Sequence, residues 1–281
     1  MADTLIAGID VSHHNGAIDW PSVSSLGVTF AFAKATEGAD PSKSSYTDNM
    51  FATNWPAMQD AGLIRGAYHF IGLPLATTPK GQWNDDLHRQ IDHFLATVGP
   101  LGPNDLPPVL DLEPDDSPQR WRDLIRSDRE GALGIVRELI QYTTEQLDPV
   151  KPILYTGSFW WSDLGDPDAS SMPFGDYVLW FAQYPSVHTP VAVPGGTDQG
   201  EASSFDEYLA TPSLSSGHPK HIPKVWGGPA TPRWNIWQFT SFGGLPPAVN
   251  GFVDLDVFNG SLDQWNALTV GAASPGPAPI T

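Results

Sequence analysis

The stretch "PPVLDLEPDD", residues 107–116, combines an apolar run of the kind that forms a buried strand with two carboxylates. Side chains alternate between the two faces of a strand, so Asp111 and Glu113 point to the same side. Placing two carboxylates together on a largely buried strand is unfavourable, because they repel one another and lose hydration. We therefore expect a functional reason for this pair.

Seven other runs have a similar apolar, strand-like character. Several are nearly continuous in their hydrophobicity, which is typical of parallel strands covered on both faces. Helical periodicity occurs between some of them, and strands that alternate with helices favour a parallel sheet. Eight strands in one chain of this size predict a closed α/β barrel of the TIM type. The strand runs are 5–12, 28–36, 63–70, 107–113, 152–157, 177–184, 235–240 and 251–258, and the helices are 48–60, 82–97 and 128–147.

The domain organisation follows from the distribution of these runs and from local composition. We expect residues 1–270 to form a single catalytic barrel domain. Residues 185–234 are rich in Pro, Gly and Ser and too long for a plain loop, which predicts an insertion over one barrel end. Residues 271–281, "GAASPGPAPIT", have the composition of a linker-like tail.

Composition restricts the function. The chain has 281 residues, of which 40% are hydrophobic, and a formal net charge of −18, which argues against nucleic acid and anionic membranes as partners. It has no cysteine, its histidines show no metal-ligand spacing, and no apolar run approaches the ~20 residues of a membrane span. We expect a soluble monomer without a cofactor or metal. The opening "MADTLIAGIDVS" lacks a basic start, so no signal peptide is expected.

The acidic residues fall near predicted strand ends, where barrels of this kind place their chemistry. Asp10 lies near the end of the first run, Asp111 and Glu113 close the fourth, and Asp254 and Asp256 lie late in the eighth. The first and eighth strands are neighbours in a closed barrel, so we expect Asp10 and Asp254 on one rim. A single Asp at a strand end is more often a cap or turn residue. The convergence of four favours an active site, although the pattern leaves the choice between Asp254 and Asp256 open.

Two carboxylates on one rim suit glycoside hydrolysis, in which one acts as acid and the other as nucleophile, base or charge stabiliser. Eleven Trp and seven Tyr could supply flat faces for sugar rings, although core packing is the simpler role for most of them. Glu113, beside Asp111 and walled by apolar residues, would have a raised pKa and suit the acid. The sequence contains no Gly-rich phosphate loop and no nucleophile elbow.

A set of short motifs occurs in order along residues 5–262: "GIDVSHHNGAIDW", "FAFAKATEG", "GAYHF", "PVLDLEP", "ILYTG", "WFAQY", "WQFTS" and "GFVDLDVF". Together they resemble glycoside hydrolase family 25, the Chalaropsis-type lysozymes or N-acetylmuramidases of bacteria, fungi and phage lysins. The resemblance implies a modified barrel, (β/α)5(β)3, with eight strands. It also implies bacterial peptidoglycan as the substrate, cleaved at the β-1,4 bond between N-acetylmuramic acid and N-acetylglucosamine.

The resemblance implies residue roles as well. Glu113 matches the general acid, and Asp111 matches a partner acting either as nucleophile or as stabiliser of an oxazolinium formed by the substrate's acetamido group. Asp10 and Asp254 match two further acids of the groove. It further implies action at the cell wall outside the cell, reached by phage-type release or another route without a signal peptide. The expected substrate-binding residues are Tyr68, Tyr155, Trp180, Gln238 and Glu37.

Two alternatives stay open. A chitinase-like or other polysaccharide hydrolase would use the same strand-end acids, although the longer Asp-rich chitinase motif is absent from "PPVLDLEP". A non-catalytic carbohydrate-binding or phage structural barrel is the other, and it would be expected to have lost one of the four acids. None of the four is missing here.

Overall fold

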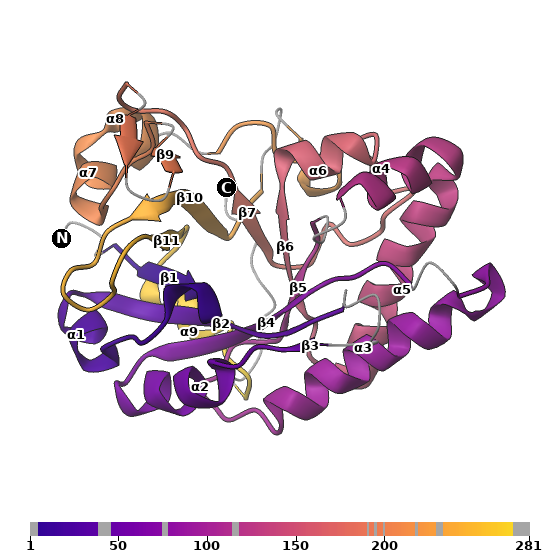
Figure 1. Cartoon of the computed structure of the whole chain (residues 1–281), viewed down its shortest axis with the longest axis horizontal. Helices are drawn as coiled ribbons and strands as arrows, with labels where there is room; N and C mark the ends of the chain where they lie inside the picture. Colours follow the sequence, from indigo (N-terminus) through magenta and orange to yellow (C-terminus); the bar gives the residue numbers. More distant parts are fainter. Residues whose placement is uncertain are drawn as a thin grey trace.

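Eight strands close into a barrel in the computed structural model (Figure 1). The structure describes residues 5–38, 46–74, 78–113, 118–189, 191–193, 196–198, 200–216, 219–228 and 233–271. Each of the eight predicted runs coincides with one strand, although β2 and β10 extend past the predicted ends, so the predicted barrel is confirmed. The barrel strands are β1 (Ala7–Val11), β2 (Val28–Glu37), β4 (Ile64–Phe70), β5 (Val109–Asp111), β6 (Ile153–Gly157), β7 (Leu179–Ala182), β10 (Ile236–Gly243) and β11 (Val253–Phe258).

Strand direction departs from one expectation. Among the eight barrel strands, β1, β2, β4, β5, β6, β7 and β10 run parallel to one another, whereas β11 is antiparallel to both β10 and β1. Asp254 is the second residue of β11 and lies opposite Asp10 in the register. The prediction that Asp254 lies late in its strand was therefore wrong, while its expected position beside Asp10 is confirmed. Because β11 runs backwards, its amino end reaches the rim formed by the carboxyl ends of the other strands.

Helices surround the barrel. The predicted helices occur as α2 (Phe51–Asp60), α3 (Trp83–Val98) and α5 (Arg129–Leu147), and α2 begins three residues after the predicted start, so that Pro56 lies in its second turn. Asp128 caps α5 by accepting a hydrogen bond from the Gly131 amide. Further elements are η1 (His13–Asn15), α1 (Trp20–Ser25), β3 (Tyr46–Thr47), η2 (Lys80–Gln82), α4 (Pro118–Ser127), α6 (Ser158–Asp163), β8 (Val191–Val193), β9 (Gly196–Asp198), α7 (Phe205–Ala210), α8 (Pro212–Ser215), η3 (Lys224–Trp226) and α9 (Leu262–Asn266).

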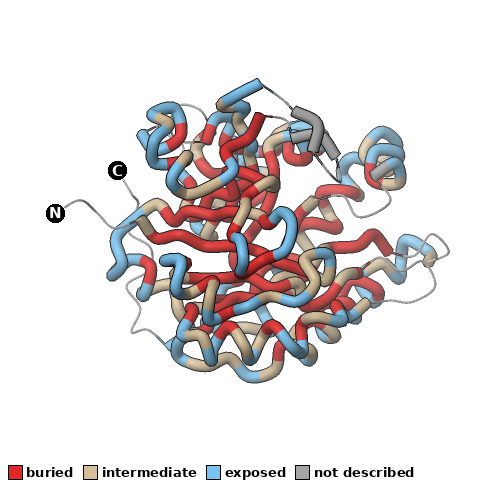
Figure 2. The backbone as a smooth tube through the Cα atoms, turned by 60° about the vertical axis from the view of Figure 1, so that its left-hand side comes forward, coloured by how far each residue is buried: buried red, intermediate tan, exposed pale blue. Residues whose placement is uncertain are grey.

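The core has two layers, one between the strands and the helices and one inside the barrel, and the buried backbone occupies the centre of the molecule (Figure 2). Inside the barrel, aromatic rings fill the end opposite the rim. The Trp265 ring of α9 packs at 4.3 Å from Phe30 and 4.8 Å from Phe258, and Phe32 stacks on Trp180 at 4.3 Å. These rings close that end of the barrel, and the polar pocket described below opens at the other end.

The segment 185–234 packs beside β10. Tyr208 of α7 contacts Trp237 and Phe239, with ring centroids 6.0 and 4.8 Å away. The Glu201 carboxylate accepts hydrogen bonds from the Thr240 hydroxyl and the Ser241 amide. The described part of this segment thus covers the outside of β10, and its proposed position over the barrel end stays a prediction. The predicted tail lies outside the described residues beyond Gly271.

Candidate active site

A pocket of about 200 Å³ opens at the rim where the parallel strands end. All four predicted catalytic acids line it, and so do four of the five predicted substrate-binding residues. The remaining one, Glu37, is outside the described lining and forms an ion pair with Lys34. The residues that line the pocket are Asp10, Ser12, His14, Lys34, Tyr68, Phe70, Asp111, Glu113, Tyr155, Trp180, Tyr184, Gln238 and Asp254.

The central carboxylates reach the pocket because β5 alternates. Leu110 and Leu112 belong to the layer under the helices, while Asp111 and Glu113 project to the barrel interior. Asp111 is only 6% exposed, and its Oδ1 has no hydrogen-bond partner in the described part of the structure. Glu113 is half-buried. The pair is therefore largely shielded from water, and one buried carboxylate oxygen of Asp111 has no protein partner among the described residues.

Burial perturbs both groups. It raises the pKa of Glu113 from 4.5 to about 7, which leaves this carboxyl substantially protonated near neutrality. Burial, followed by repulsion from Glu113, also raises the pKa of Asp111. The ammonium group of Lys34 opposes both shifts and lowers the two pKa values. Such a pair can hold one proton that is available for transfer and one negative charge.

Gln238 connects the two sides of the pocket. Its Oε1 accepts hydrogen bonds from the hydroxyls of Tyr155, at 2.8 Å, and Tyr184, at 2.5 Å. Its Nε2 donates to Oδ2 of Asp10. Because both hydroxyls donate to the amide oxygen, the amide nitrogen must face Asp10. Gln238 thus fixes the orientation of that carboxylate.

Two acids of β11 occupy different depths. Asp254 lies in the pocket, and burial raises its pKa to about 7. Asp256 is fully buried one layer below, where its Oδ1 accepts a 2.8 Å hydrogen bond from Nε1 of Trp180. Burial and repulsion from Asp254 and Asp256 also raise the pKa of Asp10. Of the two alternatives left open by the sequence, the structure brings Asp254 to the pocket.

Sequence reasoning missed several lining residues, of which Lys34 and Tyr184 matter most. Lys34 is a charged residue within an apolar strand, the same anomaly that drew attention to Asp111. Tyr184 ends the run "YVLWFAQY", and the residue is 39% exposed at the rim. An aromatic residue directly after a barrel strand is well placed to support a sugar ring.

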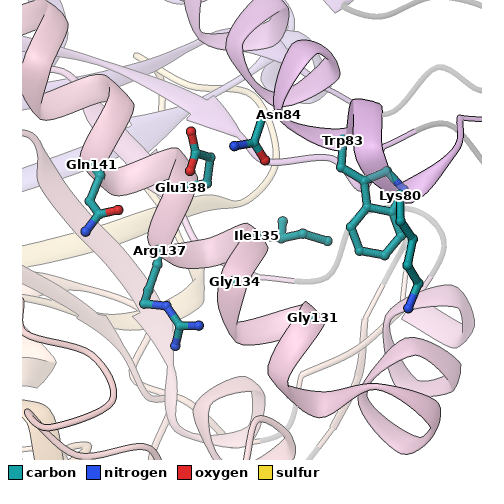
Figure 3. A pocket seen from close by; sticks show the side chains of 9 residues that line it. All are labelled: Lys80, Trp83, Asn84, Gly131, Gly134, Ile135, Arg137, Glu138 and Gln141. Atoms are coloured by element: carbon teal, nitrogen blue, oxygen red, sulfur yellow. The ribbon is translucent and has the colours of Figure 1, made fainter.

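A second, larger hollow of about 330 Å³ lies outside the barrel, between α3 and α5 (Figure 3). Trp83 and Lys80 border one side, and Arg137 and Gln141 the other. The carboxylate in its lining, Glu138, lies 2.6 Å from Nε2 of His88. Glu138 is the one carboxylate in the described lining of this hollow, which therefore lacks the carboxylate pair typical of glycoside hydrolysis, so we assign the chemistry to the barrel pocket.

Two further features are absent from the described residues. These residues contain no cluster of three or more His, Asp or Glu side chains arranged to hold a metal ion. No helix among them is long and apolar enough to cross a membrane.

Comparison with known proteins agrees with the fold and the motifs. The chain is 29% identical over 273 residues to lysozyme M1 of Streptomyces globisporus, covering 95% of this chain and 72% of that protein. It is 28% identical over 196 residues to the N,O-diacetylmuramidase of a Chalaropsis species, covering 68% of this chain and 83% of that protein. The structure of a bacterial lysozyme from Streptomyces coelicolor superposes with a TM-score of 0.64 at 26% identity, over 96% of this chain and 99% of that one. The family model for glycosyl hydrolases family 25 matches residues 9–247, so the chain belongs to this family and is a glycoside hydrolase.

Proposed function

We propose that this protein is an N-acetylmuramidase that cleaves the β-1,4 bond between N-acetylmuramic acid and N-acetylglucosamine in peptidoglycan, with retention of configuration. The observation that carries the proposal is the buried Asp111–Glu113 pair, in which the pKa of Glu113 is about 7. The names of the relatives in Streptomyces globisporus and Chalaropsis support the substrate.

In the proposed first step, Glu113 transfers its proton to the glycosidic oxygen as the bond to the anomeric carbon breaks. The acetamido oxygen of the muramic acid residue attacks that carbon and forms an oxazolinium. Asp111, ionised, accepts a hydrogen bond from the acetamido N–H and stabilises the positive charge. In the second step Glu113, now a carboxylate, removes a proton from water, and the water opens the oxazolinium from the side of the departed sugar.

The rest of the pocket suits substrate binding. The exposed ring of Tyr184 offers a flat face at the rim, and Asp10, oriented by Gln238, offers acceptor oxygens for sugar hydroxyls. The second carboxylate of this wall, Asp254, holds a proton near neutrality and can donate as well as accept. A chain of sugars requires several such contacts to align one bond with the acid pair.

The test is mass spectrometry of the fragments that the purified protein releases from defined peptidoglycan. We expect every new reducing end to be muramic acid, and no release by the Glu113→Gln variant. New reducing ends on N-acetylglucosamine, or digestion of chitin in preference to peptidoglycan, would favour the chitinase-like alternative. Binding without cleavage by the wild type would favour a non-catalytic barrel.

A further inference from the structure

Lys34 and Glu37 face the same side of β2 because the strand contains a bulge. The register between β2 and β4 shifts between Lys34 and Thr36. Thr36 faces outward, where its hydroxyl lies 2.8 Å from Nδ1 of the buried His69. Residues three apart in a regular strand lie on opposite faces, whereas the extra residue of a bulge returns Glu37 to the face of Lys34. Bulges beside active sites commonly redirect a side chain in this way.

The ammonium group of Lys34 is held in place from two sides. Nζ lies 2.6 Å from Oε2 of Glu37 and 4.6 Å from the centroid of the Phe70 ring. The side chains of Lys34 and Glu37 are only 11% and 14% exposed. Phe70 of β4 lies directly opposite Asp111 in the pairing of β4 with β5. The contact with the Phe70 ring therefore brings the lysine ammonium group towards the strand that carries the acid pair. A flexible side chain is thereby fixed beside the pocket.

This lysine acts against a large excess of negative charge. Among the described residues lining the pocket, Lys34 is the one Lys or Arg beside four carboxylates. Its attraction lowers the pKa values of Asp111 and Glu113, and for Asp111 it exceeds the opposing repulsion from Glu37. The other titratable groups that line the same pocket are Asp10, His14, Tyr68, Tyr155, Tyr184 and Asp254.

We propose that Lys34, held by Glu37 across the β2 bulge, is a positioning residue that keeps Asp111 ionised beside a protonated Glu113 and thereby sets the pH range of catalysis. The inference rests on the proposed function and adds a residue to its mechanism. Without this cation, burial favours protonation of both carboxyls. A fully protonated pair can still donate a proton, but it cannot stabilise the positive charge that develops at the sugar.

The test is the pH dependence of kcat/KM on soluble peptidoglycan fragments. Lys34→Met removes the charge and retains an unbranched side chain. Because Lys34 lowers both pKa values, we expect both limbs of the profile to move to higher pH by about one unit. The ratio of variant to wild-type kcat/KM should therefore be about 0.1 on the acid limb and rise with pH. Lys34→Arg should keep the wild-type profile even if its overall rate is lower.

The matched control is Lys151→Met. Lys151 precedes β6 at the opposite end of the barrel, pairs with Asp176 and is 47% exposed, so its profile should superpose on that of the wild type. The double variant Lys34→Met/Glu37→Gln also removes the carboxylate charge that the single variant would leave without its partner, and it decides the question if the single variant does not fold. Its profile should move in the same direction, but less far, because a repelling charge is removed with the attracting one.

A ratio that is constant with pH would show that Lys34 has only a structural role, and a shift to lower pH would contradict the charge argument. Either result would overturn this inference while leaving the proposed function intact. Failure of the proposed function is a different outcome, because the wild-type protein would then release no muramic acid ends from peptidoglycan.

Discussion

Replacing Asp254 by Asn should stabilise the folded protein at neutral and alkaline pH while lowering its activity. Burial, with repulsion from Glu113 and Glu201, raises the pKa of Asp254 from 3.8 to about 7. Below about pH 4 the carboxyl is protonated in both folded and unfolded states, so it has no net effect. As the pH rises towards 7, the unfolded chain releases the proton and the folded protein retains it. Ionisation therefore favours the unfolded state, and stability is lost across this window.

The size of the effect follows from the shift. Three pKa units at about 1.4 kcal/mol each set an upper limit of about 4 kcal/mol above pH 7. We expect about half of this, roughly 2 kcal/mol, because water and neighbouring groups rearrange around an ionised carboxylate. For a chain of this length that corresponds to an increase in Tm of about 3 °C. Asn has a similar size and cannot ionise, so it removes the penalty without creating a cavity.

The assay is urea unfolding of the wild type and Asp254→Asn at pH 4 and pH 8. We expect free energies of unfolding that differ by less than about 1 kcal/mol at pH 4, where the unfolded carboxyl has only begun to ionise, and a clearly more stable variant at pH 8, together with a lower kcat/KM. Asp60→Asn, at an exposed position on α2, is the control and should change stability by less than about 0.5 kcal/mol at either pH. If the variant's advantage is the same at both pH values, or absent at pH 8, burial does not act on Asp254 as described. Loss of folding would instead give this residue a structural role.

Four further predictions concern activity. Glu113→Gln should lower peptidoglycan cleavage by about 10²-fold or more with folding intact, and wild-type rates in this variant would remove Glu113 from the mechanism. In the wild type, the rate should be halved near pH 7 and fall about tenfold per pH unit above it, because Glu113 loses its proton there. Gln238→Met should reduce kcat/KM about tenfold, since it releases Asp10 and Tyr155 from their shared amide, and an unchanged value would mean that these side chains need no such support. Peptidoglycan with de-N-acetylated muramic acid should resist the enzyme; efficient cleavage, or a sugar trapped covalently on Asp111, would make that residue the nucleophile. Clearing of intact walls rich in anionic polymers should increase between 10 and 150 mM salt, because the net charge of −18 is screened as the Debye length falls from about 30 to about 8 Å, and a salt-independent rate would exclude long-range repulsion.

The sequence by itself determined the strands and one essential feature of the site. Each of the eight runs coincides with a barrel strand, because hydrophobic patterning along consecutive residues reports burial. The shared face of Asp111 and Glu113 also follows from the sequence, since side-chain alternation is a local property of an extended backbone. The ordered motifs also indicated the family, and the family's pattern implied the four acids of the groove. All of these inferences depend on residues that are close in the chain.

The remaining features were decided only by the tertiary structure. The reversed direction of β11 places the start of that strand, and with it Asp254, at the rim, and nothing in its own pattern states which way it runs. Gln238 reaches Asp10 across 228 positions of sequence. The bulge that joins Lys34 to Glu37 is visible only in the register between β2 and β4. These features depend on pairing between distant strands, and such pairing is set by closure of the whole barrel, whereas local patterning is set by each strand alone.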